Sequence, residues 1–334
     1  MSAPLLEITG LRAAFPGPDG PVEAVRGVDF TLEAGEVLGI VGESGSGKSV
    51  AMMALMQLLP KQARVSGSAR IKGRELIGMG AQDIRRIRGR EIGCVFQDPL
   101  SAFNPVLTIG AQIVEAIRLH DRKISRRAAR ARTIELLASV AIPEPERRAQ
   151  QYPHEFSGGM RQRAMIAMAL ANDPALLIAD EPTTALDVTV QAQILDLLRM
   201  LAQERGIGIV LITHDLGVVA GMARDIAVMY GGRVVETGTA EDIFYRSAHP
   251  YTRGLIAAMP KLDRIDEELT PIDGTPPSIF RRPPGCSFAP RCAMAEDACR
   301  ETDPDLRSAG ATRAACLRAE ELAAHAGAPR GVLA

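Results

Sequence analysis

A glycine-rich run of eight residues carries the clearest chemical signal in the sequence. It fits the pattern G-x-x-x-x-G-K-[ST] throughout and consists of Gly42, Glu43, Ser44, Gly45, Ser46, Gly47, Lys48 and Ser49. Glycines let the backbone curl so that successive N–H groups point at phosphate oxygens, and a helix that begins there adds a favourable partial charge. We expect Lys48 to reach the β- and γ-phosphates of a nucleotide and Ser49 to ligate Mg²⁺.

Two adjacent acids end an apolar run further along the chain. The run 176–179 is followed by Asp180 and Glu181. Neighbouring carboxylates at the end of a buried strand repel each other unless a cation compensates their charge. We therefore expect Asp180 to hold Mg²⁺, directly or through water, and Glu181 to polarise an attacking water molecule.

The elements that would position these groups alternate between strands and helices. Apolar periodicity predicts strands at 37–41, 92–96, 176–179 and 207–213, and helices at 50–59, 188–205 and over much of 108–150. Two more strands, 226–230 and 233–237, flank Gly231-Gly232, which is a hairpin signal. This alternation favours an α/β fold with a mostly parallel sheet and helices on both faces. After residue 260, frequent prolines predict an irregular C-terminal appendage.

Length and composition restrict the function classes. The 334 residues suggest two structural units, and the net charge of −1 gives no overall drive towards nucleic acid. No apolar run approaches the roughly 18 residues of a membrane-spanning helix, and no secretory signal precedes the first strand. The expectation is a protein that folds in the cytoplasm. A basic run between Arg118 and Arg132 is read either as a solvated helix face after an N-cap at Ser125 or as a contact for an acidic partner or a membrane surface.

A third motif, between the first two, resembles the signature of ABC transporters, which usually reads L-S-G-G-Q and opens a helix. Here the residues are Phe156, Ser157, Gly158, Gly159 and Met160, with Phe and Met replacing Leu and Gln. A serine and two glycines at a helix N-terminus suit a second phosphate receptor. The resemblance implies that Ser157, Gly158 and Gly159 bind the γ-phosphate held by the partner subunit's loop.

The same resemblance assigns roles to four other positions. It makes Gln97 the Q-loop glutamine that contacts Mg²⁺, Asp187 the D-loop acid, His214 the switch histidine and Phe15 the aromatic that stacks on adenine. The implied catalytic residues are Glu181, His214 and Gln97, with ATP and Mg²⁺ as ligands. The implied fold is a P-loop ABC-type nucleotide-binding domain over 1–260, with a helical subdomain near 98–160.

Three segments are similar to the peptide-importer branch of that family, which also includes nickel and some sugar importers. They are 160–170, His249-Pro250-Tyr251-Thr252 and 285–292. This similarity implies an ATPase at the cytoplasmic face of the inner membrane that energises peptide import. Its implied partners are a second ATPase subunit, homologous or identical, two permease subunits and an extracytoplasmic binding protein, without nucleic acid.

Four of the five cysteines lie within the last 50 residues, in the predicted extension 261–325: Cys286, Cys292, Cys299 and Cys316. Clustered thiols in a cytosolic chain favour a metal site over disulfides, and ligation by thiolates alone suits zinc or an iron–sulfur cluster. The spacing is looser than in compact zinc sites, which usually use C-x2-4-C pairs. Members of the resembled family can carry a [4Fe-4S] cluster there, which favours the cluster over zinc; free thiols are the third possibility. Their distance in sequence from the ATP motifs favours a structural or redox-sensing role.

Two other function classes fit the sequence less well than an importer ATPase does. A soluble ABC ATPase of DNA repair would carry a long coiled coil between Lys48 and Ser157, and one of translation would carry two tandem cassettes; neither is present. A metal-regulated binding subunit without turnover would not need both Glu181 and His214.

Overall fold

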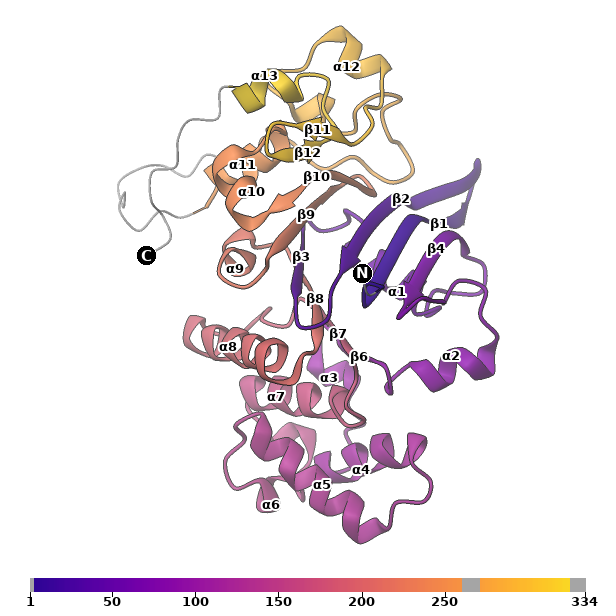
Figure 1. Cartoon of the computed structure of the whole chain (residues 1–334), viewed down its shortest axis with the longest axis vertical. Helices are drawn as coiled ribbons and strands as arrows, with labels where there is room; N and C mark the ends of the chain where they lie inside the picture. Colours follow the sequence, from indigo (N-terminus) through magenta and orange to yellow (C-terminus); the bar gives the residue numbers. More distant parts are fainter. Residues whose placement is uncertain (1–2, 260–270, 325–334) are drawn as a thin grey trace. The chain divides into compact units, whose positions relative to one another are not determined.

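The computed structural model describes residues 3–259 and 271–324, and this part of the chain divides into two compact units. Unit 1 comprises the chain up to residue 6, then 32–37 and 71–212. Unit 2 comprises 7–31, 38–70 and the chain from 213 onward. Figure 1 labels the elements of both units. The predicted boundary between 260 and 261 lies outside the described residues.

Unit 1 is built on three parallel strands in the order β8-β7-β6. Their bounds are β6 Ile92–Val95, β7 Leu176–Asp180 and β8 Gly208–Thr213, and the short strand β5 covers Arg74–Glu75. Apolar side chains fill β7 and β8 almost continuously, as expected of parallel strands that are covered on both faces. The register pairs Val95 with Ala179 and Asp180 with Ile212. The carboxyl ends of the three strands therefore lie side by side.

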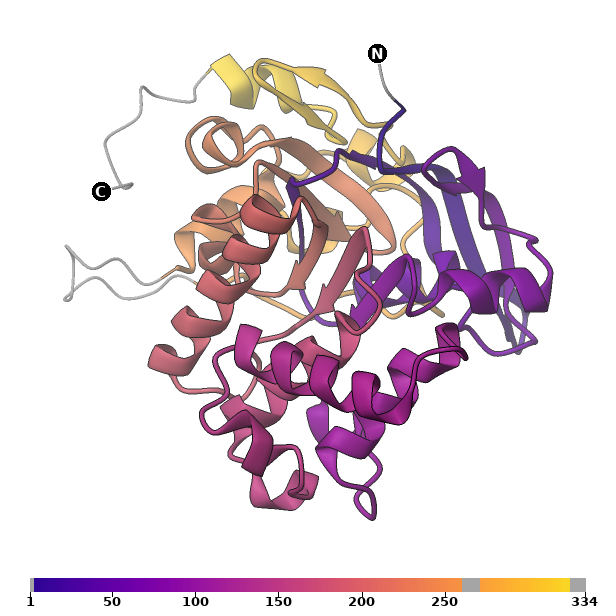
Figure 2. The same cartoon turned by 60° about the horizontal axis from the view of Figure 1, so that its bottom comes forward.

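Helices make up most of the rest of unit 1. They are α2 Ala81–Ile87, α3 Pro99–Ala102, α4 Ile109–His120, α5 Arg126–Ser139, α6 Pro145–Arg148, α7 Gly158–Ala169 and α8 Val188–Arg205, with a 3₁₀ turn at Pro153–Glu155. Figures 1 and 2 show α4, α5 and α7 packed side by side. The predicted N-cap at Ser125 is confirmed, since its Oγ accepts from the N–H of Ala128 at 3.1 Å. The helical subdomain expected near 98–160 corresponds to α3 through α6.

Unit 2 contains two sets of strands. β2 (Gly20–Leu32), β1 (Leu6–Gly17) and β4 (Arg64–Ile71) are neighbours in that order. The second set runs β11 (Arg307–Ala309), β12 (Thr312–Ala314), β10 (Arg233–Thr239), β9 (Asp225–Tyr230) and β3 (Val37–Val41). In this set β3 pairs with β9 in parallel, whereas the β9–β10, β10–β12 and β11–β12 pairs are antiparallel. The prediction of a mostly parallel sheet thus holds for unit 1 and is wrong for this set, because hairpins connect β9 to β10 and β11 to β12.

Short helices complete unit 2. They are α1 Lys48–Leu55, α9 Leu216–Ala220, α10 Ala240–Arg246, α11 Pro250–Ala257, α12 Asp297–Glu301 and α13 Ala319–Ala324, with a 3₁₀ turn at Ala289–Arg291. The predicted turn Gly231-Gly232 is confirmed, with φ of +55° and +84°, values that suit glycine in a two-residue hairpin. No helix in either described stretch has the length and apolar character needed to cross a bilayer.

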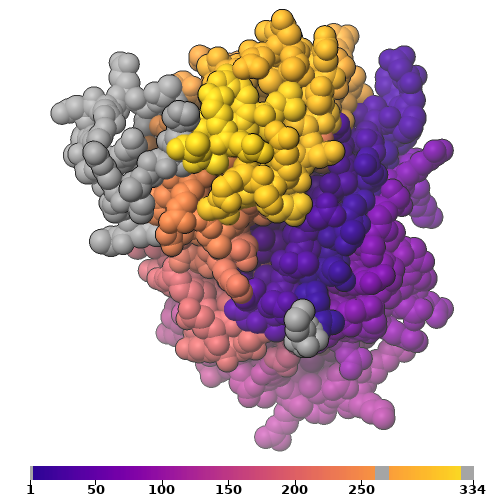
Figure 3. Space-filling model, turned by 45° about the horizontal axis from the view of Figure 1, so that its top comes forward, coloured from indigo at the N-terminus to yellow at the C-terminus, as the bar shows by residue number. Residues whose placement is uncertain are grey.

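The C-terminal segment is more ordered than its prolines predict. Ala314 of β12 pairs with Glu236 of β10, so the segment extends the strand order of unit 2 instead of forming an irregular appendage. The hydroxyl of Thr312 also donates to Glu236 Oε1 at 2.8 Å. Figure 3 shows the segment, in yellow, continuous with the N-terminal strands of the same unit, in indigo.

Candidate functional site: phosphate loop, carboxylates and thiol pocket

The glycine-rich loop joins β3 to α1 within unit 2, as the sequence predicts, and its shape requires glycine at two positions. A Cβ at Gly42 would lie 2.2 Å from the carbonyl oxygen of Met229, and one at Gly47 would lie 2.6 Å from that of Ala24. Gly47 also has a φ of +100°, in a region that favours glycine. Close contact with neighbouring backbone therefore fixes where the loop lies.

The lysine of the loop is folded back across it. Lys48 is buried, with 5% exposure, and its Nζ donates to the carbonyl oxygens of Gly42 at 2.6 Å and Glu43 at 3.0 Å. Ser44 and Gly45 are exposed, whereas Ser46 and Gly47 are buried. The loop thus has an exposed edge with a cation beneath it, which is the arrangement a phosphate group requires.

Residues far along the chain hold the loop from the side. The N–H of Glu43 donates to Tyr251 Oη at 2.9 Å, and the Glu43 carboxylate accepts two hydrogen bonds from Arg291. The N–H of Gly232, in the β9–β10 turn, donates to the carbonyl oxygen of Ser46 at 3.0 Å. Tyr251 and Arg291 lie in two of the segments that are similar to peptide importers, but their sequence context predicts no role at the loop. No local pattern could have found these contacts.

The carboxylate of Glu181 is positioned within unit 1. Its Oε2 accepts from Gln97 Nε2 at 2.9 Å and from Thr184 Oγ1 at 2.9 Å. Gln97 and Glu181 meet because they follow β6 and β7, whose carboxyl ends are adjacent. Asp180, which directly precedes Glu181, is the last residue of β7 and is half-buried. The structure therefore brings together two of the three predicted catalytic residues and adds Thr184, which the sequence analysis missed.

Glu181 also has an unusual backbone. Its φ is +47°, and its N–H donates to the carbonyl oxygen of Ile212 at 2.9 Å. A side chain with a Cβ costs roughly 1–2 kcal/mol in this left-handed conformation. Strain of this kind gathers at functional sites, where the surrounding structure imposes it. The outlier supports a role for the Glu181 side chain itself.

The predicted signature residues begin α7 of unit 1. Ser157 caps this helix by accepting from the N–H of Met160 at 3.3 Å, and Gly158 is exposed. A Cβ at Gly159 would lie 2.6 Å from Val190 Cγ1, so this glycine lets α7 approach α8 closely. Asp187 caps α8 through the N–H of Val190 at 2.9 Å. The predicted signature and D-loop are therefore neighbours at the N-termini of two packed helices.

Two further predicted residues lie in unit 2. His214 is exposed and follows β8 directly, and Asp215 after it caps α9. Phe15 is half-buried near the end of β1.

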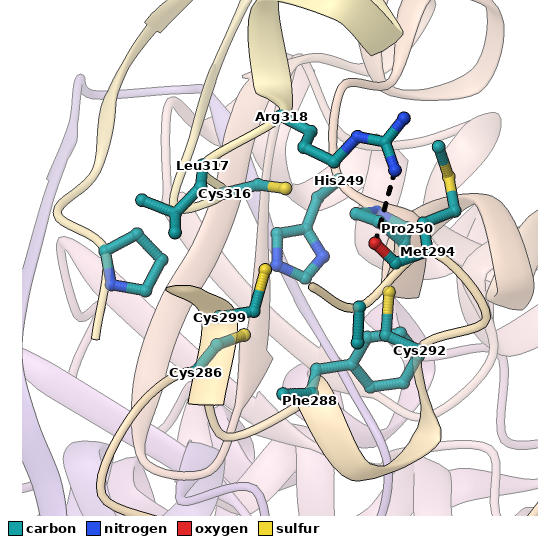
Figure 4. Close-up of a pocket in the computed structure, with 13 residues that line it drawn as sticks. His249, Pro250, Cys286, Phe288, Cys292, Met294, Cys299, Cys316, Leu317 and Arg318 are labelled. Atoms are coloured by element: carbon teal, nitrogen blue, oxygen red, sulfur yellow. Dashed lines mark hydrogen bonds between the residues drawn. The ribbon is translucent and has the colours of Figure 1, made fainter. Parts of the chain in front are cut away.

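The four C-terminal cysteines line one pocket in unit 2, together with His249 (Figure 4). The sulfurs of Cys286, Cys292 and Cys316 each receive a backbone hydrogen bond from the residue two positions further on, and Cys286 receives a second from Ala289. Such N–H contacts suit thiolate sulfurs that bind a metal.

The size of the pocket, the arrangement of its side chains and the protonation of its thiols do not correspond to a formed metal site. Its volume is about 20 Å³, room for about one water molecule. Among the residues described, no group of three or more His, Cys, Asp or Glu side chains is arranged to hold a metal ion. Burial raises the pKa of Cys316 to about 11, and neighbouring thiols add to the effect. The predicted metal-binding appendage is therefore present as a pocket with the right atoms, not as a formed metal centre.

His249 does not add a ligand to this set. Its Nδ1 accepts from the N–H of Tyr251 at 3.1 Å, and the ring also hydrogen-bonds the backbone of Ala315. Burial lowers the pKa of His249 to about 4, so the ring is neutral. The sulfur atoms of the pocket belong to the four cysteines and to Met294, whose thioether also lines it.

The comparisons with known proteins match this arrangement. Residues 25–184 match the family described as ABC transporter, and 235–299 match the one described as oligopeptide/dipeptide transporter, C-terminal region. The second match starts well before the predicted boundary at 261.

Several curated relatives are similar over most of the chain. The oligopeptide transport ATP-binding protein OppD of Salmonella typhimurium is 50% identical over 95% of both chains. The dipeptide transport ATP-binding protein DppD of Bacillus subtilis is 52% identical over 86% of both. OppD of Mycobacterium tuberculosis is 52% identical over 95% of this chain, which spans about half (52%) of that relative's length.

Solved structures agree on the nucleotide-binding fold. The dimeric ABC transporter cassette MJ0796 is 30% identical, with a TM-score of 0.63 over 70% of this chain and 98% of the cassette. Its post-hydrolysis state bound to ADP and Pi gives the same TM-score at 29% identity.

Proposed function

Because this chain belongs to the ATP-binding subunits of ABC transporters, in the oligopeptide/dipeptide class, we propose that it hydrolyses ATP to energise the import of short peptides. One observation carries the proposal: a phosphate loop that admits no side chain at Gly42 or Gly47 and lays Lys48 beneath its exposed edge. The two family matches, over 25–184 and 235–299, support the coupling to peptide transport.

The loop of unit 2 would bind the nucleotide through its backbone. When ATP enters, Lys48 exchanges its two carbonyl partners for the β- and γ-phosphates, since phosphate oxygens carry the greater negative charge. The N-terminus of α1 and backbone N–H groups of the loop would surround the phosphates. Ser49, Asp180 and Gln97 would hold Mg²⁺, and Phe15 would stack on adenine.

The carboxylate of Glu181 is the proposed general base. Gln97 and Thr184 both donate to one of its oxygens, Oε2, each at 2.9 Å. These contacts orient the carboxylate, which would accept a proton from the attacking water. His214 stabilises the γ-phosphate as charge develops on it. In this arrangement the chain supplies a base and an orienting group, while Mg²⁺ supplies charge neutralisation.

The signature residues act on a second ATPase subunit. The N-terminus of α7, a helix of 12 residues, presents Ser157, Gly158 and Gly159 as a receptor for the γ-phosphate bound by the partner's loop. The dimeric state of the similar cassette supports this pairing. The partner is a homologous chain or a second copy of this one, and Asp187 lies at their interface. Two ATP molecules close the dimer and hydrolysis reopens it.

The full transporter would place this chain at the cytoplasmic face of the cell membrane. It would act as a peripheral subunit beneath two permeases, with an extracytoplasmic binding protein that selects the peptide. Nickel, carried by importers of the same branch, is the second candidate solute. The names of the relatives, which specify oligopeptide and dipeptide transport, favour peptides.

The thiol pocket is proposed to hold a [4Fe-4S] cluster, with zinc as the alternative. Four sulfurs with no competing nitrogen ligand, three of them receiving backbone N–H groups, fit a soft metal. Binding requires the thiols to turn and lose their protons. A bound metal would supply a structural cross-link for a segment that has little apolar core of its own.

Transport by the reconstituted complex tests the function. The chain is assembled with its two permeases in proteoliposomes, ATP is enclosed on the ATPase side, and uptake of labelled di- and tripeptides is measured with the binding protein present. We expect uptake that requires ATP and disappears with Lys48→Ala. ATP hydrolysis that no peptide stimulates, combined with nickel uptake, would establish the alternative solute.

A further inference from the structure

We propose that Arg291 is a positioning residue for nucleotide binding: it holds the phosphate loop in its binding shape by clamping Glu43. The proposal deepens the proposed ATP site and rests on it. It gives the C-terminal segment a direct part in nucleotide affinity.

The guanidinium group of Arg291 is fixed from several sides. Its Nη1 donates to Glu43 Oε2 at 2.6 Å and its Nη2 to Oε1 at 3.0 Å, which makes the pair bidentate. The same group donates to the carbonyl oxygens of Ile272 at 3.1 Å and Asp273 at 2.8 Å, and to Tyr230 Oη at 3.2 Å. The Arg291 side chain is only 5% exposed. A charge-assisted pair with this geometry is strong and directional.

Both the side chain and the backbone of Glu43 are held. While Arg291 binds the carboxylate, the Glu43 N–H donates to Tyr251 Oη at 2.9 Å. Tyr251 is fully buried and packs against Tyr230 and Phe288, with ring centroids 4.6 and 5.3 Å away. The aromatic cluster is therefore a rigid support for the second residue of the loop.

The clamp acts on Lys48 through Glu43. The carbonyl oxygens of Gly42 and Glu43 both accept from the Lys48 ammonium group. A change in the Glu43 backbone moves both acceptors and hence the ammonium group that faces the phosphates. Removal of Arg291 also leaves the half-buried Glu43 carboxylate without its cation, beside a site for anions. Both effects weaken nucleotide binding, one by geometry and one by charge.

The position of Arg291 ties the clamp to the thiol pocket. Arg291 lies in the 3₁₀ turn 289–291, between Cys286 and Cys292, and the same stretch carries Phe288 of the aromatic cluster. One short turn therefore faces the pocket with its cysteines and the phosphate loop with its arginine.

The test compares ATP affinity with thermal stability in the full-length chain. Mg-ATP binding is measured by calorimetry and unfolding by thermal melts for Arg291→Met, Arg291→Lys, Glu43→Gln and the double variant Arg291→Met/Glu43→Gln. Arg300→Met is the matched control, because Arg300 also lies beside a cysteine of the same segment but pairs only with the exposed Asp297.

We expect Arg291→Met to raise the Kd for ATP about tenfold or more, which corresponds to about 1.4 kcal/mol or more. The double variant should recover part of the loss, because the uncompensated carboxylate is gone, and Arg300→Met should bind as the wild type does. Arg291→Lys should lie between wild type and Arg291→Met.

An Arg291→Met variant with a lowered melting temperature and an unchanged Kd would reduce the pair to a structural contact and overturn the proposal. If Arg291→Met does not fold, wild-type affinity in both Glu43→Gln and Arg291→Lys overturns it equally. Failure of the wild type itself to bind ATP would instead refute the proposed function.

Discussion

Replacement of Glu181 by Gln tests the assignment of the general base. The change removes one negative charge and keeps the length of the side chain. Its amide oxygen can take the place of Oε2 and accept from both Gln97 and Thr184, which now lie 2.9 Å from that atom. The backbone at φ +47° has the same cost for Gln as for Glu. The variant therefore changes the chemistry more than the fold.

The magnitudes follow from these contacts. A positioned general base contributes about 10²–10⁴ in rate, or about 2.7–5.4 kcal/mol at 1.36 kcal/mol per factor of ten. The two hydrogen bonds then go to a neutral acceptor instead of a charged one, which costs about 1 kcal/mol of stability for each bond. Each kcal/mol shifts the Tm by roughly 2–4 °C for a domain of this size. Binding of ATP should not weaken, because a carboxylate near the phosphates is removed.

The assay separates these effects. ATP turnover is measured in the assembled complex, and ATP binding in the purified chain. Asp196→Asn is the matched control, since Asp196 also lies in unit 1 but forms only an exposed pair with Arg199. A Glu181→Gln complex that turns over ATP within a factor of about three of the control refutes the assignment. Loss of ATP binding would show instead that Glu181 acts on the ground state.

The remaining predictions concern other parts of the chain. Lys48→Ala should weaken ATP binding, because it removes the cation beneath the loop; unchanged affinity in calorimetry would count against the loop assignment. Ser157→Arg should leave ATP binding to the chain's own loop intact but abolish the ATP-dependent dimer in size-exclusion chromatography, and normal dimerisation would defeat the partner-site proposal. Anaerobically purified protein should contain about four irons and four sulfides per chain. The Cys292→Ser variant should lose them and expose the C-terminal segment to protease, while ATP still binds. Stoichiometric zinc without iron would establish a zinc site in place of the cluster, and protein with neither iron nor zinc would refute both metal proposals. Burial raises the pKa of Glu236, so the stability of the wild type falls as pH rises above 4.5 towards that raised pKa. The Glu236→Gln variant should therefore have the higher Tm near pH 8 and lose this advantage below pH 4.5. Parallel curves of Tm against pH for wild type and variant would contradict this account.

Local signals predicted much of the fold. The strand 37–41 and the helix 188–205 have the expected bounds, because the first is continuously apolar and the second begins after an Asp cap and ends at Gly206, with φ of +64°. The loop that starts at Gly42 is equally local, since the spacing of its glycines encodes its conformation. The antiparallel β10–β12 pair was missed, because two short strands of three and seven residues that meet across 73 or more positions leave no periodic signal.

Some residues of the candidate site also have a recognisable sequence signal, whereas others do not. Glu181 was predicted from the two acids that end an apolar run, and Gln97 from the family resemblance. The register of β6 with β7 explains why they meet. Thr184 was missed because a threonine after a strand has many ordinary roles in turns.

The C-terminal segment shows that separation along the chain does not predict which residues contact the phosphate loop. The cysteine segment lies far along the chain from the phosphate loop, which favoured a role remote from ATP. Yet Arg291 and Glu43, 248 positions apart, form a bidentate pair, and Tyr251, 208 positions from Glu43, accepts from its backbone. The glycines set which conformations the loop can adopt, but they do not choose among them, because glycine is permissive. The choice comes from contacts that lock one conformation, and three of these are made by residues beyond 229. The loop motif is thus local in sequence, whereas its shape depends on the folded C-terminal half of unit 2.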